Sequence, residues 1–573
     1  MITNTILSKR DSRERILNGV QKVADAVTST LGPGGRNVMI EQPNGLSPIV
    51  TKDGVSVAKS IRLDDNFENM GSQMVIEVAS KTNTSCGDGT TTATLLASEM
   101  YKNAVHMVDG MGYEPMTVKR KMLSALDEAK EKIQNCIIKI DDDESVRNVA
   151  CISANGDAEI GKMVSDIISE TGKDGIIVVQ EGNNLTTTHS ITKGMRLDSG
   201  FESAYFATPN AEGKIMATYD DAYVLFYMGK ISSVQELFPI MQKAVTKGKK
   251  PLIIIASDYE AEVLSTLVVN KLQMGVRLCA VKAPGVLEAI KKEKLTDAAI
   301  ATGGTLISPD LGIKLQDVQL EHLGHVKRVE ITSTSTTLID GDANKELFEQ
   351  RVTELQSQIN DDNIDDYKRH NCRERLARLV GGIGVVKVGG ETRSIIHEKR
   401  DRIDDAICAT REAISGGIVA GAGITLLKIG LEMTGGVVRP NENEAFSDEF
   451  SKKIYSPENF GRTIVGFALQ SPYFKILDNA GYKSTSEAAD IIKHYVDLIG
   501  SGKATNTENV GYNVSNWTRS DNLVADGVID PANVTLSAVT NATSVAALLI
   551  STDCMVGINK DSVPTAIPYM PEM

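Results

Sequence analysis

Two glycine-rich segments near the N-terminus combine residue types that suit phosphate binding. Residues 28–35 read TSTLGPGG, and residues 86–93 read CGDGTTTA directly before a helical pattern. Glycine lets the backbone approach a ligand closely, and the free N–H groups at a helix start attract anions. The threonine hydroxyls add donors, and Asp88 is a candidate ligand for the Mg²⁺ that accompanies a polyphosphate. Each segment alone fits a capped helix after a tight turn equally well.

A third candidate for this chemistry is Asp405, on a helix expected over 402–414. Four residues of that helix recur on one stripe: Ile403, Ile407, Thr410 and Ile414. Asp405 lies about 200° from Ile403 at 100° per residue, so it projects away from the packed face. A carboxylate there can polarise the water that attacks a phosphoryl group. The pattern alone fits an ordinary acidic residue in a first helical turn better.

Two common nucleotide-binding motifs do not occur in the sequence. It contains no Gly-x-x-x-x-Gly-Lys-Ser/Thr, and no Gly-x-Gly-x-x-Gly follows an expected strand. The glycine-rich segments therefore belong neither to a P-loop nor to a dinucleotide-binding fold.

Two expected helices of the central region carry apolar side chains well beyond the stripe that a surface helix needs. They are Leu237, Phe238, Ile240 and Met241 in one helix, and Val263, Leu264, Leu267, Val268 and Val269 in the other. An exposed apolar groove usually marks a binding surface, and flexible Met and Leu side chains suit varied apolar partners. Burial of both helices on all sides explains the pattern equally well.

The expected elements change in character along the chain. Helical patterns at 22–31, 69–81 and 91–107 surround short strands at 37–40 and 48–50. Short strands then alternate with helix-like stretches, at 175–179, 222–227, 251–256, 277–281 and 305–308. A charged helix over 346–380, a strand at 385–388 and further helices follow. This order suggests an α/β domain inserted between two halves of a helical one, with hinges or plain turns at Gly194, Gly382 and Gly417.

Composition excludes several classes of function. The chain has 573 residues, enough for two to four domains, and a formal charge of −14, which disfavours nucleic acid as a partner. We found no uninterrupted apolar run of about 18 residues, so we expect no membrane association. Residues 1–15 mix charges of both signs without an apolar stretch, so we expect a cytoplasmic protein. The seven cysteines are scattered without a Cys-x-x-Cys pair, so we expect reduced thiols.

Ordered motifs along nearly the whole chain resemble those of the group I chaperonins, the GroEL-like ATP-driven folding machines. They are ADAV at 24–27, TLGPxGRNV at 30–38, TKDGVSVA at 51–58, FENMG at 67–71, GDGTTTAT at 87–94, TLVVN at 266–270, VKAPG at 281–285, AxxATR at 406–411 and DGVIDP at 526–531, where x marks a position outside the match. The resemblance implies a multidomain α and α/β chaperonin fold. Its helical equatorial domain would comprise 1–135 and 416–573, its small intermediate domain 136–192 and 384–415, and its inserted α/β apical domain 193–383.

The resemblance also implies an ATP site with Mg²⁺ and a possible K⁺ ion. Carried over position by position, the nucleotide-binding residues are Thr30, Leu31, Gly32, Pro33, Lys52, Asp88, Gly89, Thr90, Thr91, Thr92, Ile152, Ser153, Gly421, Ala422, Ile476, Asn513, Val514, Val528 and Asp530. Asp88 resembles the family's Mg²⁺ ligand. Asp405 matches the carboxylate that assists hydrolysis, and Asp53 matches its partner near the attacking water.

The implied function is an ATP hydrolase that captures non-native polypeptides and promotes their folding in a ring cavity. The apolar positions that match the family's client-binding surface are Phe201, Tyr205, Phe206, Phe238, Met241, Leu264, Val268 and Val269. The resemblance further implies a homo-oligomeric ring, most simply sevenfold, and a possible co-chaperonin.

Several departures from the family pattern suggest a divergent branch, with a virus as one candidate source. Gly34 stands where the family usually has Lys, and Ala422 replaces a glycine near the nucleotide. Phe474 and Lys483 replace a basic and an acidic residue used between rings, so we expect weaker or nucleotide-dependent ring pairing. Residues 431–458 form a longer segment than usual, and residues 562–573 lack the family's Gly-Gly-Met tail.

Two other classes of function stay open at this stage. A small-molecule kinase would need a polar substrate pocket, whereas the expected groove is apolar. A passive holdase would need no hydrolysis site, yet Asp53, Asp88 and Asp405 are all present. ATPase activity measured with and without a non-native client separates the three.

Overall fold

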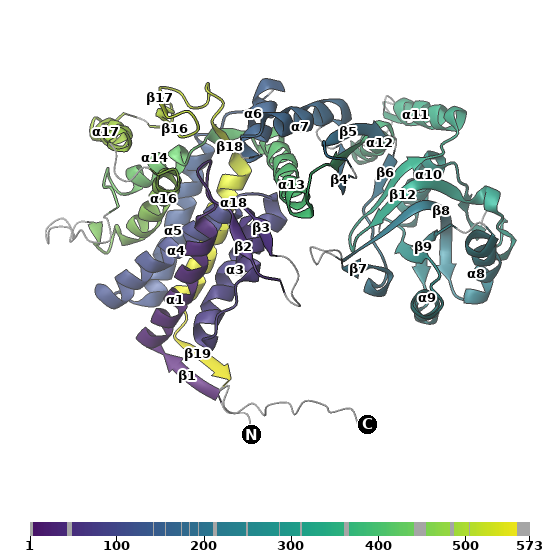
Figure 1. Cartoon of the computed structure of the whole chain (residues 1–573), viewed down its shortest axis with the longest axis horizontal. Helices are drawn as coiled ribbons and strands as arrows, with labels where there is room; N and C mark the ends of the chain where they lie inside the picture. Colours follow the sequence, from purple (N-terminus) through teal and green to yellow (C-terminus); the bar gives the residue numbers. More distant parts are fainter. Residues whose placement is uncertain are drawn as a thin grey trace. The chain divides into compact units, whose positions relative to one another are not determined.

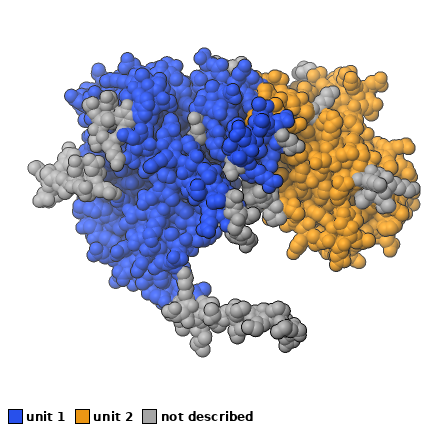
Figure 2. All heavy atoms as spheres, viewed as in Figure 1, with its two compact units in different colours: residues 1–166, 181–186, 388–573 blue, residues 167–180, 187–387 orange. Residues whose placement is uncertain are grey.

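The structure is a computed structural model, and the chain divides into two compact units (Figure 2). It describes residues 4–42, 48–140, 143–154, 156–172, 175–182, 184–192, 194–209, 215–247, 250–285, 287–309, 312–359, 366–439, 454–481, 486–503 and 505–558. Unit 1 comprises Met1–Asp166, Glu181–Thr186 and Val388–Met573, and unit 2 comprises Ile167–Gln180 and Thr187–Lys387. Unit 1 thus contains both ends of the chain. The separate intermediate domain, and the boundaries expected from the family, stay predictions.

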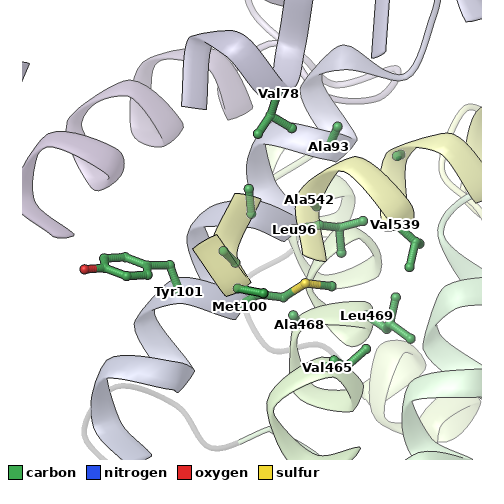
Figure 3. Close-up of a cluster of buried hydrophobic side chains, with 14 of the residues drawn as sticks. Val78, Ala93, Leu96, Met100, Tyr101, Val465, Ala468, Leu469, Val539 and Ala542 are labelled. Atoms are coloured by element: carbon green, nitrogen blue, oxygen red, sulfur yellow. The ribbon is translucent and has the colours of Figure 1, made fainter. Parts of the chain in front are cut away.

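Unit 1 is a bundle of long helices that lie side by side (Figure 1). They are α1 (Lys9–Thr28), α3 (Asn66–Cys86), α4 (Thr90–Val105), α5 (Pro115–Gln134), α16 (Phe460–Asn479) and α18 (Ala532–Ile550). α4 is buried on nearly all sides, because its apolar residues are not confined to one stripe. Figure 3 shows its side chains Leu96 and Met100 close to Ala468 of α16 and to Ala542 of α18. This core fixes the start of α4, which begins at Thr90.

Among the described residues, α18 is the only helix long and apolar enough to cross a membrane by length and composition. Most of that stretch is buried in the molecule, and α18 packs against α3, α4 and α5. This stretch is not an uninterrupted apolar run, because Asn533, Thr535 and Ser537 lie among its apolar residues. We therefore assign α18 to the core of unit 1.

Shorter elements surround the bundle in unit 1. The helices are α2 (Gly54–Ser60), η2 (His106–Gly110), α6 (Asp143–Ser153), α7 (Ala158–Thr171, which continues into unit 2), α13 (Arg393–Gly416), α14 (Ile424–Met433) and α17 (Ser486–Gly500). Antiparallel strand pairs are β1 (Asn4–Ser8) with β19 (Cys554–Ile558), β2 (Val38–Ile40) with β3 (Ile49–Thr51), β15 (Ile418–Ala420) with β18 (Ile529–Pro531), and β16 (Gly511–Asn513) with β17 (Thr518–Ser520).

Unit 2 is built on a mixed sheet of order β10-β9-β8-β12-β13-β6, with β7 and β11 paired to β8. The strands are β6 (Gly194–Leu197), β7 (Thr208–Pro209), β8 (Ile215–Ile231), β9 (Leu252–Tyr259), β10 (Leu278–Lys282), β11 (Leu306–Ile307), β12 (Gly324–Ile331) and β13 (Thr336–Gly341). Strand β9 is almost entirely buried and runs parallel to both neighbours. A second sheet has the order β4-β14-β5, with β4 (Ile176–Glu181), β5 (Thr188–Thr192) and β14 (Ile383–Val388).

Helices cover the large sheet of unit 2 (Figure 1). They are η3 (Ala204–Phe206), α8 (Val234–Met241), η4 (Gln242–Lys247), α9 (Ala261–Met274), α10 (Glu288–Thr302), η6 (Leu315–Asp317), η7 (Leu320–His322), α11 (Lys345–Ile359) and α12 (Asp366–Val380). The predicted α/β character of the centre is confirmed. The predicted helix over 346–380 corresponds to two helices, α11 and α12, and residues 360–365 lie outside the described part.

A buried ion cluster attaches α11 and α12 to α10. The carboxylate of Asp297 on α10 is fully buried and accepts hydrogen bonds from Arg375 Nε (2.7 Å) and Nη2 (3.0 Å), and from Arg351 Nε (2.8 Å). Arg375 also pairs with Glu293 at 2.9 Å. A charge shielded from water needs such partners, because removing one leaves the other uncompensated.

We expect Arg375→Met to lower the free energy of unfolding of unit 2 by about 3 kcal/mol, because Asp297 keeps only one cationic partner. Hydrogen exchange should rise in α11 and α12 before it rises in the sheet. The matched control is Arg378→Met, which breaks the more exposed pair with Asp198 (2.6 Å) and should cost less than about 1 kcal/mol. Equal rates of hydrogen exchange in α11 and α12 of the two variants would contradict a stabilising role for the buried ion cluster.

Candidate active site

One cavity of about 310 Å³ in unit 1 gathers both glycine-rich segments and Asp405. Its lining includes every predicted nucleotide-binding or hydrolytic residue except Gly421. Those residues are Thr30, Leu31, Gly32, Pro33, Lys52, Asp53, Asp88, Gly89, Thr90, Thr91, Thr92, Ile152, Ser153, Asp405, Ala422, Ile476, Asn513, Val514, Val528 and Asp530. Gly421 lies behind the wall, where its N–H donates to the Val528 carbonyl at 2.9 Å.

The start of α4 forms one wall of the cavity. Gly87 and Gly89 precede it with φ of +70° and +79°, a region that side chains disfavour. A Cβ at Gly87 would lie 2.5 Å from the Cys408 side chain on α13, and one at Gly89 would lie 2.5 Å from Val534 on α18. Since Gly89 provides no side-chain cap, the first N–H groups of α4 stay available to a ligand. This wall therefore suits an anion.

The other glycine-rich segment follows α1 and is held by the end of α16. The Asn479 side chain donates from Nδ2 to the carbonyls of Thr28 (2.8 Å) and Leu31 (2.9 Å). A Cβ at Gly34 would lie 2.6 Å from the backbone of Ala480, so a larger residue there requires a backbone shift. This close approach explains why Gly34 tolerates no side chain where the family usually has Lys.

Asp53 reaches the cavity from the turn between β3 and α2. Its carboxylate caps α2 by accepting hydrogen bonds from Val55 N (3.0 Å), Ser56 N (2.9 Å) and Ser56 Oγ (2.6 Å). A Cβ at Gly54 would lie 2.4 Å from Thr91 Oγ1. The turn therefore packs directly on the first turn of α4, which places Asp53 beside the anion-binding wall.

Helix α13 presents four ionisable side chains to the cavity at helical spacing: Glu398, Asp401, Arg402 and Asp405. The sequence analysis predicted only Asp405, although the i, i+3, i+4 and i+7 spacing puts all four on one face. Arg402 donates to Glu398 Oε2 at 2.7 Å and to Asp157 Oδ2 at 3.3 Å. The bond to Asp157 fastens α13 to the segment between α6 and α7, whereas the bond to Glu398 stays within α13.

The carboxylates of the cavity interact unfavourably with one another. Burial, followed by the charges of Asp88 and Asp53, raises the pKa of Asp405 well above its usual range. Burial raises the pKa of Asp88, although hydrogen bonds from Gly89 N and Ser153 oppose this shift. Burial and the Asp88 charge raise the pKa of Asp530 to about 7. A bound cation would relieve this repulsion.

The donor set fits a Mg²⁺ ion that arrives with a polyphosphate. No group of three or more His, Cys, Asp or Glu residues in the described part of the chain could hold a metal ion. Mg²⁺ typically takes one or two carboxylates and completes its shell with phosphate oxygens and water. Asp88, next to the open N–H groups of α4, meets that requirement.

Ala422 lines the cavity in a strained conformation, with φ of +54°. The left-handed region costs an L-residue roughly 1–2 kcal/mol, whereas glycine adopts it freely. The departure from glycine at this position therefore strains the backbone at the cavity wall, just before α14.

The predicted client-binding residues divide into exposed and buried sets in unit 2. Tyr205, Phe238 and Val269 are 67%, 62% and 46% exposed, on η3, α8 and α9. Phe201, Leu264 and Val268 are partly buried. Phe206 and Met241 are buried in the core beneath them, so the expectation that all eight face a groove is wrong for these two. Leu272 and Met274 at the end of α9 are exposed and were not predicted.

The positions expected to weaken ring pairing are only partly described. Phe474 is half-buried within unit 1, where its ring lies 5.8 Å from that of Tyr473 and 5.6 Å from the Arg439 guanidinium. Lys483 and the tail at 562–573 lie outside the described residues, as do residues 440–453 of the longer segment at 431–458.

Asp530→Asn should stabilise the nucleotide-free protein at pH 8 but not at pH 4. Between these values native Asp530 retains a proton that the unfolded chain has lost, so stability falls as pH rises from about 4 to 7. The substitution removes this loss, on the order of 4 kcal/mol above pH 7, because each pKa unit corresponds to about 1.4 kcal/mol. Thermal unfolding from pH 4 to 8 measures it, with the exposed Asp526→Asn as control. A gain in thermal stability that is the same at every pH would contradict the raised pKa of Asp530.

The chain matches the model of the TCP-1/cpn60 chaperonin family over residues 23–560. Its fold is similar to two crystal structures of the chaperonin gp146 from the bacteriophage EL 2 (Pseudomonas aeruginosa), determined in the presence of ATP-BeFx. Crystal form II gives 21% identity and a TM-score of 0.65, and crystal form I gives 22% and 0.59. Each match covers 96% of this chain and 98% of the other. The chain therefore belongs to the TCP-1/cpn60 chaperonin family, as a divergent, GroEL-like member.

Proposed function

We propose that this chaperonin binds and hydrolyses ATP in the unit 1 cavity and uses the cycle to capture and release non-native polypeptides on unit 2. The observation that carries the proposal is the convergence of Asp53, Asp88, Asp405 and two glycine-rich segments on one cavity. Family membership supports the chaperone role. ATPase activity measured with and without a denatured client tests it, and stimulation or inhibition by the client is the expected outcome.

The cavity offers different chemistry to the two ends of a nucleotide. The N–H groups of α4 and the hydroxyls of Thr90, Thr91 and Thr92 suit phosphate oxygens. Apolar side chains of Ile476 and Val514 suit a nucleobase. Asp88 would hold Mg²⁺, which neutralises phosphate charge when bound, and K⁺ is a further candidate counter-ion for this acidic cavity.

Asp405 and Asp53 are the proposed hydrolytic residues. In the reaction, a water oxygen bonds to the γ-phosphorus while the bond from that phosphorus to the β–γ bridging oxygen breaks, giving ADP and phosphate. The two carboxylates would orient the attacking water, and Asp405 would accept its proton. Burial raises the pKa of Asp405, which makes its ionised carboxylate a stronger base.

Client capture would use the apolar patch formed by Tyr205, Phe238, Val269, Leu272 and Met274. These side chains come from η3, α8 and α9, which are neighbours in unit 2. Exposed apolar side chains gain free energy when a non-native chain covers them. Assembly into a homo-oligomeric ring, sevenfold by resemblance to group I chaperonins, and action with a co-chaperonin belong to the same proposal.

Asp405→Asn should lower kcat for ATP hydrolysis by about 10²-fold or more, because the amide cannot accept the proton from water. Affinity for ADP should stay within about threefold, since the proposal gives Asp405 no role in holding ADP. The control is Asp404→Asn on the same helix turn, which should keep most activity. Unchanged kcat in Asp405→Asn at saturating ATP would refute the assignment.

Phe238→Ser and Val269→Ser should each weaken capture of a denatured client by about tenfold or more, because each loses apolar burial. Capture is measured as suppression of the light scattering that an aggregating client produces. Retained ATPase activity shows that each variant is folded. Val380→Ser removes an equally exposed apolar side chain from the end of α12 and should capture client normally. Equal capture by all three variants would show that the patch is not the capture site.

A further inference from the structure

Lys428 is a fully buried lysine in the middle of α14, and within the described part of the chain its ammonium group forms no ion pair. Its Nζ donates to the Glu508 carbonyl and to Asn509 Oδ1, both at 3.1 Å. The nearby acid, Glu432, is instead paired with Lys132 at 2.7 Å. Burying an ammonium group is costly, and neutral acceptors compensate it less than a carboxylate does. General packing alone therefore does not account for lysine at this position.

The segment that Lys428 contacts leads directly into the β16–β17 hairpin. Tyr495 lies on α17, and its hydroxyl donates to the Glu508 carbonyl (3.3 Å) and to the Val510 carbonyl (2.8 Å). His494 Nε2 lies 2.7 Å from Glu508 Oε2. The α17 side chains thus hold the outer side of the segment, whereas Lys428 ties it to α14.

Both elements joined by Lys428 line the cavity of unit 1. The start of α14 and the two residues before it contribute Ala422, Gly423, Thr425 and Leu426, and the hairpin contributes Asn513, Val514 and Ser515. Lys428 lies only two residues beyond Leu426, and Asn509 lies four residues before Asn513. Lys428 therefore links the two segments from which these lining residues come.

We propose that Lys428 is a positioning residue that sets the spacing between α14 and the β16–β17 hairpin and thereby determines affinity for the nucleoside end of the nucleotide. The inference rests on the proposed nucleotide site. Lys428 itself does not line the cavity, so it acts through the residues on either side. The phosphate end depends on α4, Asp53 and Asp88, which lie on other elements, so its affinity should not depend on Lys428.

The test compares Lys428→Met with the parent, since methionine keeps much of the volume and removes the charge. KM for ATP and Kd for ADP should each rise about tenfold, with kcat within about twofold. Affinity for inorganic tripolyphosphate, which lacks the nucleoside, should stay unchanged. Lys271→Met is the matched control, because this half-buried lysine likewise donates to a main-chain carbonyl, that of Phe206, in unit 2.

Asn509→Ala provides a second arm if Lys428→Met fails to fold, because it removes only the side-chain acceptor. Asn509→Ala should raise KM for ATP and Kd for ADP by about threefold each. Unchanged KM and Kd in the folded variants, or a parallel loss of tripolyphosphate affinity, would overturn the inference. Failure of the parent to bind ATP would instead refute the proposed function, so the two failures are distinguishable.

Discussion

Repulsion among carboxylates in one cavity is the constraint on which the rest of unit 1 depends. Asp53, Asp88, Asp405 and Asp530 approach one another where water is scarce, and the pKa values of the last three are raised. Such an arrangement is unfavourable in the empty cavity, so a rigid scaffold must maintain it. The buried helices α4 and α18 provide that scaffold. A polyphosphate with its bound cation would relieve this repulsion. Binding of such a ligand should therefore raise the free energy of unfolding of unit 1.

Close backbone packing keeps these carboxylates in place. Gly54, Gly87 and Gly89 bring the α2 turn, α13 and α18 so close to the start of α4 that no Cβ fits between them. Each contact joins segments that are distant in sequence, so the site forms only when unit 1 is folded. Because α13 carries Asp405, its contact at Gly87 through Cys408 also ties the proposed hydrolytic side chain to the glycine turn before α4.

The sequence placed the residues that line the unit 1 cavity more accurately than the exposed apolar residues of unit 2, for physical reasons. Helical periodicity showed that Asp405 points away from a packed stripe, but only the resemblance to the chaperonins singled it out from an ordinary acidic residue in a first helical turn. Phe206 and Met241 were not recognised as buried, because burial depends on the β-sheet beneath them, which no local pattern reveals. Strand β12 was missed because polar residues such as Lys327 and Glu330 interrupt its apolar ones. Helix α1 begins earlier than expected, at Lys9, and its first half contains Arg13, whose burial beside Asp109 no local pattern reveals.

The departures from the family pattern follow from the same packing argument. Gly34 lies against Ala480, and Phe474 lies beside the Arg439 guanidinium, so both have acquired neighbours within the subunit. Ala422 keeps the left-handed conformation of a glycine despite its strain. A backbone that retains this conformation without glycine must be held by its surroundings, and Gly423 next to it packs against Pro472 and Tyr473 of α16. The cavity wall at the start of α14 is thus fixed by its packing on α16, whose Pro472 also lines the cavity, so the shape of this wall persists although its glycine has been replaced.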